Sequence, residues 1–94
     1  MKIFKELKKL GYKHYTEHTI EELDNLPLNS EERIMEQALV LKWFREKYNL
    51  HYVIVKAESW FYTINGCNTQ EGFNTYEEAE LACLKKLIEI VKLK

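Results

Sequence analysis

The chain has little of what disordered, membrane-spanning and disulfide-rich proteins need. Its 94 residues include only three glycines, one proline and two cysteines. With 46% apolar residues, this composition argues against a disordered chain and against long flexible linkers. No apolar run approaches the roughly 18 residues of a membrane span, and residues 1–5 lead into charged residues where a signal peptide would have an apolar core. We therefore expect a cytoplasmic protein in which Cys67 and Cys83 are reduced thiols and form no disulfide.

The chain also lacks a strong charge of either sign. Its formal net charge of −1 argues against strong non-specific attraction to nucleic acid, which depends on many Lys and Arg residues neutralising phosphates. Lysines do cluster near both ends, and they would form one positive surface if the ends met in space. The lysines are Lys2, Lys5, Lys8, Lys9, Lys13, Lys85, Lys86, Lys92 and Lys94. We interpret them as the solvated faces of amphipathic helices.

The length predicts one domain with one core over residues 1–94, divided into an N-terminal helical extension (1–28) and an α-β-β-β-α core (29–94). Apolar spacing predicts a short helix over residues 3–10 that ends at Gly11. Thr19 and Glu22 have the spacing of a capping box, and Pro27 ends the short helix that they open.

A longer helix is predicted from a cap at Asn29 or Ser30 to about residue 48. Its main apolar stripe is Ile34, Ala38, Leu41, Phe44 and Tyr48. A second stripe on a different side is Met35, Leu39 and Trp43. Packing against a sheet needs only the first stripe, so the second requires another partner, for which the N-terminal helix is the nearest candidate.

Residues 51–56 and 59–64 are predicted strands, because they are rich in β-branched and aromatic residues, and residues 67–73 should return as a third strand. Asn65-Gly66 favours a two-residue type I′ turn between the last two strands. Alternation places Trp60, Tyr62 and Ile64 on the core face and Phe61 on the open face. With a final helix over residues 76–93, the prediction is an α+β fold in the order α-α-α-β-β-β-α, a three-stranded antiparallel meander with both long helices over one face of the sheet.

The junction at residues 72–79 (GFNTYEEA) combines the end of a strand, a cap at Thr75 and a Glu78 placed to reach back to that cap. It resembles the strand-to-helix junction of AP2-type and phage-integrase arm-type DNA-binding domains. Those families read DNA with arginine-rich strands, whereas this sheet offers only Lys56, so the resemblance implies a fold and no DNA-binding residues. The order of elements is similar to double-stranded-RNA-binding domains, but glutamates stand where those carry phosphate-binding lysines.

A broader pattern over residues 35–82, with Trp43, Trp60 and Tyr62, resembles small uncharacterised proteins encoded by phages and integrated elements of gut bacteria. That resemblance implies a genetic setting and supplies no catalytic residues.

No constellation in the sequence indicates catalysis, a cofactor or a metal. His14 and His18 have i, i+4 spacing, but the segment lacks a helical pattern and further ligands, so we interpret them as surface histidines. Cys83 falls on a core face, and Cys67 has no neighbouring histidine that would activate it.

The sequence therefore predicts a non-enzymatic accessory protein that acts through contacts with an unidentified protein or with a second copy of itself. The predicted interaction surface comprises Met35, Leu39, Trp43, Phe61, Leu81, Leu84 and Ile88. The alternative is weak binding of single-stranded nucleic acid through Phe61 and the terminal lysines. For Phe61 we favour packing under the N-terminal segment or another subunit.

Overall fold

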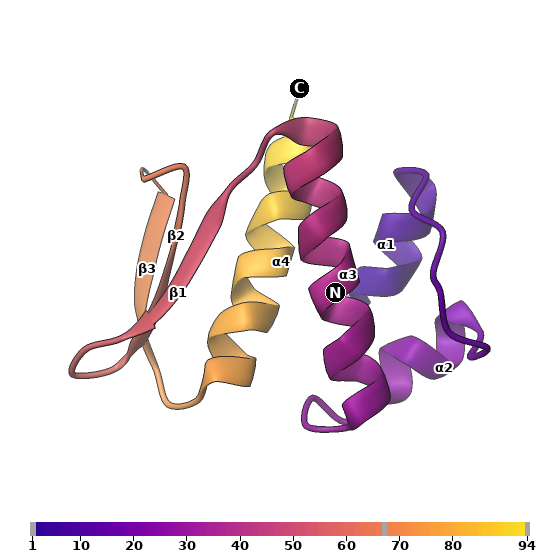
Figure 1. Ribbon diagram of the computed structural model, residues 1–94, viewed down its shortest axis with the longest axis horizontal. Coiled ribbons are helices and arrows are strands. Elements are labelled where there is room, and N and C mark those ends of the chain that lie inside the picture. Colours follow the sequence, from indigo (N-terminus) through magenta and orange to yellow (C-terminus); the bar gives the residue numbers. More distant parts are fainter. Residues whose placement is uncertain (1, 67, 94) are drawn as a thin grey trace.

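The computed structural model describes residues 2–66 and 68–93, and its elements follow the predicted order (Figure 1). The helices are α1 (Ile3–Lys9), α2 (Ile20–Asn25), α3 (Glu31–Tyr48) and α4 (Tyr76–Lys92). The strands are β1 (Tyr52–Lys56), β2 (Trp60–Ile64) and β3 (Asn68–Phe73). The prediction of an α+β fold with an antiparallel meander is confirmed.

The sheet has the order β1-β2-β3, and its two connections differ. Asn65 and Gly66 have positive φ angles of 52° and 73°, as the predicted turn requires. The first paired positions are Ile64 and Asn68, so the connection is longer than the two-residue turn that we expected. The predicted core face of β2 is correct, since Tyr62 and Ile64 are buried.

Helix α4 covers the inner face of the sheet and contacts all three strands (Figure 1). Its predicted cap is present, because Thr75 Oγ1 accepts a hydrogen bond from the Glu78 N–H at 3.1 Å. The Glu78 carboxylate accepts from the N–H of Asn74 at 3.3 Å, one residue before the predicted contact. Ala79 and Cys83 are fully buried, and these small side chains allow the helix to approach the sheet closely.

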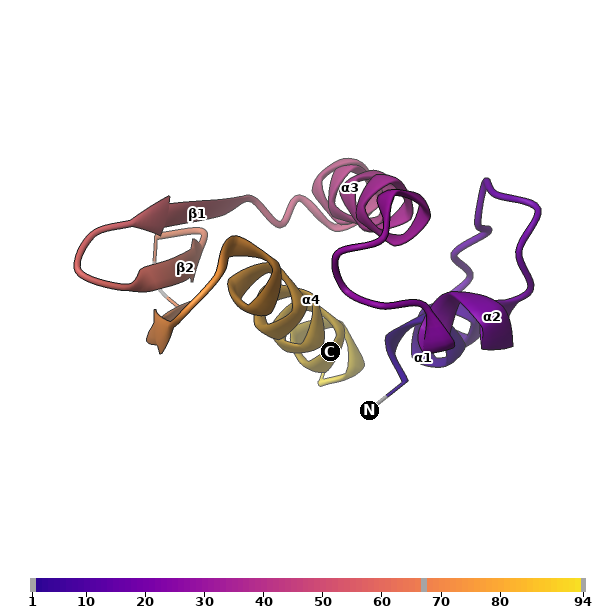
Figure 2. The ribbon, with the colours of Figure 1, turned by 90° about the horizontal axis from the view of Figure 1, so that it is seen from below.

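Helix α3 does not cover the sheet, which corrects our expectation that both long helices would. Figure 2 shows α4 lying between the sheet and the remaining helices. The physical reason is that α4 buries two of its sides: Leu84 and Ile88 are fully buried in the same cluster as Phe4 and Leu41. Helix α4 therefore covers the inner face of the sheet by itself. Helix α3 packs with α1 and α2 on the side of α4 that faces away from the sheet.

The N-terminal helices belong to the same core as the rest of the chain, through Ile3, Phe4, Leu7 and Leu23. The capping box of α2 is formed as predicted, with the Glu22 N–H donating to Thr19 Oγ1 and the Thr19 N–H donating to Glu22 Oε1, both at 3.1 Å. Of the two predicted caps for α3, Ser30 is the one used.

Candidate functional site

Over residues 31–39, the first half of the long helix α3, polar side chains are buried and apolar side chains lie at the surface. Arg33, Glu36 and Gln37 are at most 7% exposed, whereas Met35 is 63% and Ile34 is 37% exposed. The predicted main stripe is therefore wrong at Ile34 and Ala38, both of which face solvent, although Leu41 and Phe44 of that stripe are buried. What the buried polar residues bind explains this arrangement.

Glu36 fastens the connection between α1 and α2 to the long helix. Its carboxylate accepts hydrogen bonds from the Tyr12 hydroxyl, from the N–H of Tyr15 at 3.0 Å and from the N–H of Thr16 at 3.1 Å. Backbone N–H groups in a segment without regular structure need acceptors, and a buried carboxylate supplies them. Burial and then the bond to Glu36 raise the pKa of Tyr12, so its hydroxyl remains a donor.

The Arg33 side chain caps the C-terminal end of helix α2. Its guanidinium donates to the carbonyl oxygens of Leu26 at 2.8 Å and Asp24 at 3.2 Å, which lie at the end of that helix. These carbonyls have no partner inside the helix, so the arginine takes the place of a C-terminal cap. The same guanidinium lies over the Phe4 ring, 5.7 Å from its centroid.

Gln37 joins this polar cluster to α4. It accepts from Arg33 Nε at 2.8 Å and donates to Glu80 Oε1 at 2.7 Å. Burial raises the pKa of Glu80, against the opposing effect of its hydrogen bonds from Gln37 and Tyr76. A continuous polar chain thus crosses the core from α2 through α3 to α4 and fixes the rotation of α3 about its axis.

With its polar side turned inward, α3 presents apolar side chains outward. We call five apolar residues between positions 34 and 43 that are exposed or half-buried the outer face: Ile34, Met35, Ala38, Leu39 and Trp43. Beside them lies Tyr15, which is 72% exposed. A shallow depression is lined by Tyr15, Leu39, Lys42, Trp43 and Glu46. The predicted stripe of Met35, Leu39 and Trp43 therefore does lie on the surface.

Trp43 has partners within the chain. Its ring meets Tyr12 edge-on at a centroid distance of 5.4 Å and Tyr48 at 5.3 Å, and the Lys47 ammonium lies 5.1 Å from its centroid. The sequence predicts that the second stripe needs another partner, with the N-terminal helix as the nearest candidate. For Trp43 this partner lies within the chain, but it is Tyr12, in the connection after α1, and not helix α1 itself. Met35 is the residue of the stripe that stays most exposed.

The other residues of the predicted interaction surface lie elsewhere. Leu84 and Ile88 are fully buried, so placing them on a surface was wrong, and Leu81 is half-buried. Phe61 is half-buried on the open face of the sheet, paired across the strands with Val55 and Glu71. The N-terminal helices lie on the far side of α4 (Figure 2), so the first of the two partners expected for Phe61, the N-terminal segment, was wrong, and packing under another subunit stays a prediction.

The residues considered for metal binding and catalysis lie apart. Within residues 2–66 and 68–93, no three His, Cys, Asp or Glu side chains gather as a metal site would require. His18 lies 3.6 Å from Glu22, and His51 contacts Asn49 at 2.9 Å. Burial and then Glu80 raise the pKa of the Cys83 thiol to about 12, which leaves it protonated and unreactive at neutral pH. Cys67, and with it the predicted absence of a disulfide, lies outside the described residues.

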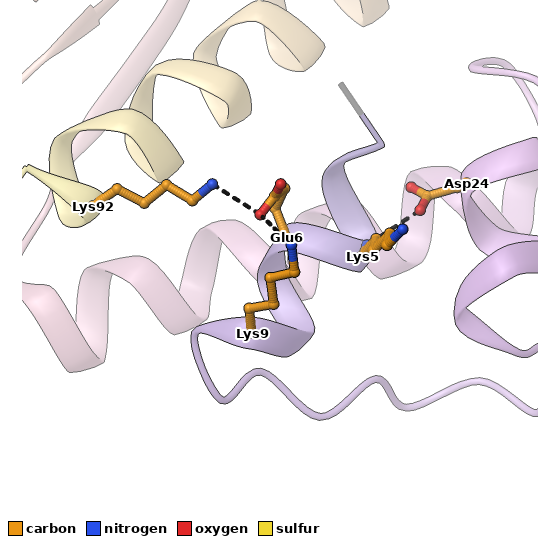
Figure 3. Close-up of polar contacts among 5 residues, drawn as sticks. All are labelled: Lys5, Glu6, Lys9, Asp24 and Lys92. Carbon is orange, nitrogen blue, oxygen red and sulfur yellow. Dashed lines mark hydrogen bonds and ion pairs between the residues drawn. The ribbon is translucent and has the colours of Figure 1, made fainter.

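Helix α1 and the end of helix α4 do meet, but acidic residues lie among their lysines (Figure 3). Lys92 of α4 reaches Glu6 of α1 at 2.8 Å, and Lys9 lies 3.7 Å from the same carboxylate. Asp24 accepts hydrogen bonds from the N–H groups of Phe4 at 2.8 Å and Lys5 at 3.1 Å, which caps the start of α1. The lysines therefore surround carboxylates that partly neutralise them.

Comparison with protein-family models, with curated proteins and with solved structures finds no match. In the described part of the chain, none of the helices has the length and apolar content that crossing a bilayer requires.

Proposed function

We propose that this protein is a non-enzymatic interaction module that acts through protein contacts, with the outer face of α3 as its binding surface. The observation that carries the proposal is the reversed polarity of the first half of α3, residues 31–39, in which Arg33, Glu36 and Gln37 are buried while Met35 and Ile34 are exposed. A surface helix ordinarily places its apolar residues in the core. Here a buried hydrogen-bond network holds the apolar residues outside.

The side chains on and beside the outer face are of the kinds that protein interfaces favour. Methionine, tyrosine and tryptophan are enriched at the centres of interfaces, where they carry much of the binding energy. Met35 adapts to a partner's shape, because its side chain is unbranched and flexible. Tyr15 is held in place, because its N–H bonds to Glu36 and its ring meets Tyr12 edge-on at 6.5 Å. A fixed aromatic ring loses little conformational freedom on binding.

Site-specific photocrosslinking in cells that naturally make the protein tests the proposal. A benzophenone amino acid at position 35 is expected to give a discrete adduct with another polypeptide. The matched control carries the same group at Lys8, which is also exposed on a helix but lies on α1. Untagged wild-type protein should compete the adduct away, whereas untagged Met35→Glu protein should not. No adduct at position 35, or the same adducts at both positions, would contradict the proposal.

Binding of single-stranded nucleic acid, the alternative function, gains no support from the geometry. Phe61 lies on the open face of the sheet with Glu71 across the strands, and the lysines of α1 lie on the opposite side of α4 (Figure 2). A strand of nucleic acid would have to pass around the molecule to reach both. At low salt, we expect wild-type protein and Phe61→Ala to bind an oligothymidylate probe equally weakly or not at all. Binding that is lost in Phe61→Ala would support the alternative function.

From the resemblance of residues 35–82 to small proteins of phages and integrated elements, we also propose a mobile-element setting for the gene. Genes for phage replication or virion proteins on either side would support it, and a neighbourhood of housekeeping genes would contradict it.

A further inference from the structure

The two edges of the sheet differ in how they are protected against pairing with another strand. On β3 the sequence is polar (NTQEGF) and the register shifts opposite Gly72, since Trp60 pairs with Phe73 and Phe61 with Glu71. Polar side chains and bulges are devices that keep an edge strand unpaired. On β1 the sequence is YVIVK, with a single charge at its end, no proline and no register shift. The β1 edge has none of these devices along its first four residues.

The backbone groups on the outer side of β1 are free to pair. Asn65 donates its N–H to the His51 carbonyl at 2.7 Å, and Ala57 donates to the Ser59 carbonyl at 3.0 Å, so the odd-numbered residues of β1 face β2. By the alternation of an antiparallel ladder, the N–H and C=O groups of Tyr52, Ile54 and Lys56 point outward. Among the residues that the structure describes, no loop or side-chain group hydrogen-bonds to them. Figure 2 shows β1 at the outside of the sheet with no helix across its edge.

We propose that β1 pairs antiparallel with β1 of a second copy of this chain, with Ile54 opposite Ile54 of the partner subunit and Tyr52 opposite Lys56 of the partner subunit. This register uses the outward groups of all three residues. A shift by one residue toward the N-terminus would require Leu50, whose N–H is already bonded to the Phe44 carbonyl at 3.3 Å. A shift the other way would move the pairing into the turn after Lys56.

Charge and side-chain fit favour a second copy as the occupant. In the proposed register no two like charges meet, because the only charged residue of the strand, Lys56, lies opposite Tyr52 of the partner subunit and can place its ammonium against that ring. On the open face, Val53 lies opposite Val55 of the partner subunit, so β-branched side chains pair at both ends of the contact. The apolar strip of exposed Val53 and Val55 and half-buried Phe61 then continues into the partner, and a single twofold axis generates the whole contact.

A charge-pairing experiment tests both the dimer and its register. Val53 and Val55 are 51% and 39% exposed, so their substitution leaves the core intact. The double variant Val53→Glu, Val55→Glu places carboxylates opposite one another at both ends of the contact. The double variant Val53→Glu, Val55→Lys places opposite charges there instead. Sedimentation equilibrium should find twice the chain mass for wild type and for the second variant, and the mass of one chain for the first.

Two further measurements complete the test. Lys56→Pro removes one outward N–H without removing a bond to β2, so it should also give a monomer. The amide of Ile54 should exchange with solvent more slowly as the protein concentration rises. A wild-type protein that stays monomeric at millimolar concentration overturns the proposal, as does a dimer that all three variants leave unchanged. The outcome is independent of the function proposed for α3, because Met35→Glu should leave the dimer intact.

Discussion

Replacing Glu36 should show how strongly the buried carboxylate holds the N-terminal segment. In Glu36→Leu the side chain keeps a similar volume but accepts no hydrogen bond. The hydroxyl of Tyr12 can turn toward another acceptor, but the N–H groups of Tyr15 and Thr16 then have none. Glu36→Gln retains one oxygen for the two N–H groups, and its amide nitrogen can donate to the Tyr12 hydroxyl.

The expected magnitudes follow from the number of donors left unpaired. A fully buried donor without a partner costs about 1–3 kcal/mol. The N–H groups of Tyr15 and Thr16 are partly buried, so Glu36→Leu should lower the free energy of unfolding through them by an amount near the lower end of about 2–6 kcal/mol. Glu36→Gln exchanges charge-assisted bonds for neutral ones, which differ by about 1 kcal/mol each, so we expect a loss of about 1–3 kcal/mol. A small domain has about 5–15 kcal/mol in total, so Glu36→Leu can remove much of its stability.

Urea unfolding measures these losses, followed by circular dichroism and by the fluorescence of Trp43 in a Trp60→Phe background, since Trp43 contacts Tyr12. The control is Glu46→Gln on the same helix, where an exposed ion pair with Lys42 at 3.9 Å should contribute no more than about 0.5 kcal/mol. Amide exchange at Tyr15 and Thr16 should accelerate in Glu36→Leu. If Glu36→Leu is as stable as wild type, the carboxylate does not hold this segment and our account of α3 is wrong.

Three further predictions concern single groups. The pKa of Tyr12 is raised above its ordinary value of 10.0, so the protonated hydroxyl contributes its full stability below pH 10, and this contribution is lost as the pH rises further. In Tyr12→Phe the urea midpoint should therefore fall less steeply at alkaline pH. The pKa of Glu80 is raised above 4.5, so ionisation of this buried group lowers the stability of the fold as the pH rises. Glu80→Gln should therefore raise the urea midpoint at pH 7. This gain should become smaller toward pH 4. Gly66 has a φ of 73°, and a methyl group added to it would meet no atom of the described residues within 4 Å. Gly66→Ala should therefore lower the free energy of unfolding by about 1 kcal/mol through backbone strain alone, and Gly66→Asn by less. Thermal unfolding measures both losses.

The features that the sequence predicts correctly are those decided by residues close together in the chain. The capping box of Thr19 and Glu22, the caps Ser30 and Thr75, and the positive φ angles at Asn65 and Gly66 each depend on atoms within four residues. Local chemistry alone determines them, so a single sequence is enough. The order of elements and the core face of β2 follow in the same way.

The layer arrangement could not be predicted, because it depends on how many sides of α4 are buried. Leu84 and Ile88 looked like surplus apolar surface as long as both long helices were expected on one sheet face. In the structure they join the core cluster of α1 and α3. A pattern of apolar residues gives the width of a buried surface, but it does not say which element covers each part of it.

The polarity of α3 shows which energies a periodicity analysis leaves out. Rotating α3 to bury Ile34 and Met35 would gain at most about 1.5–3 kcal/mol, because their exposed fractions together amount to about one whole side chain. The same rotation would withdraw Arg33 from the carbonyls of α2 and Glu36 from the N–H groups of Tyr15 and Thr16, at about 1–3 kcal/mol for each group left unpaired. It would also expose Val40, Leu41 and Phe44, which are at most 1% exposed. The observed orientation prevails because it keeps both these apolar side chains and the polar contacts to backbone groups in place. The exposed methionine is therefore a consequence of the polar and apolar contacts on the other side of the helix, and a partner that covers Met35 would bind a surface that folding has already fixed.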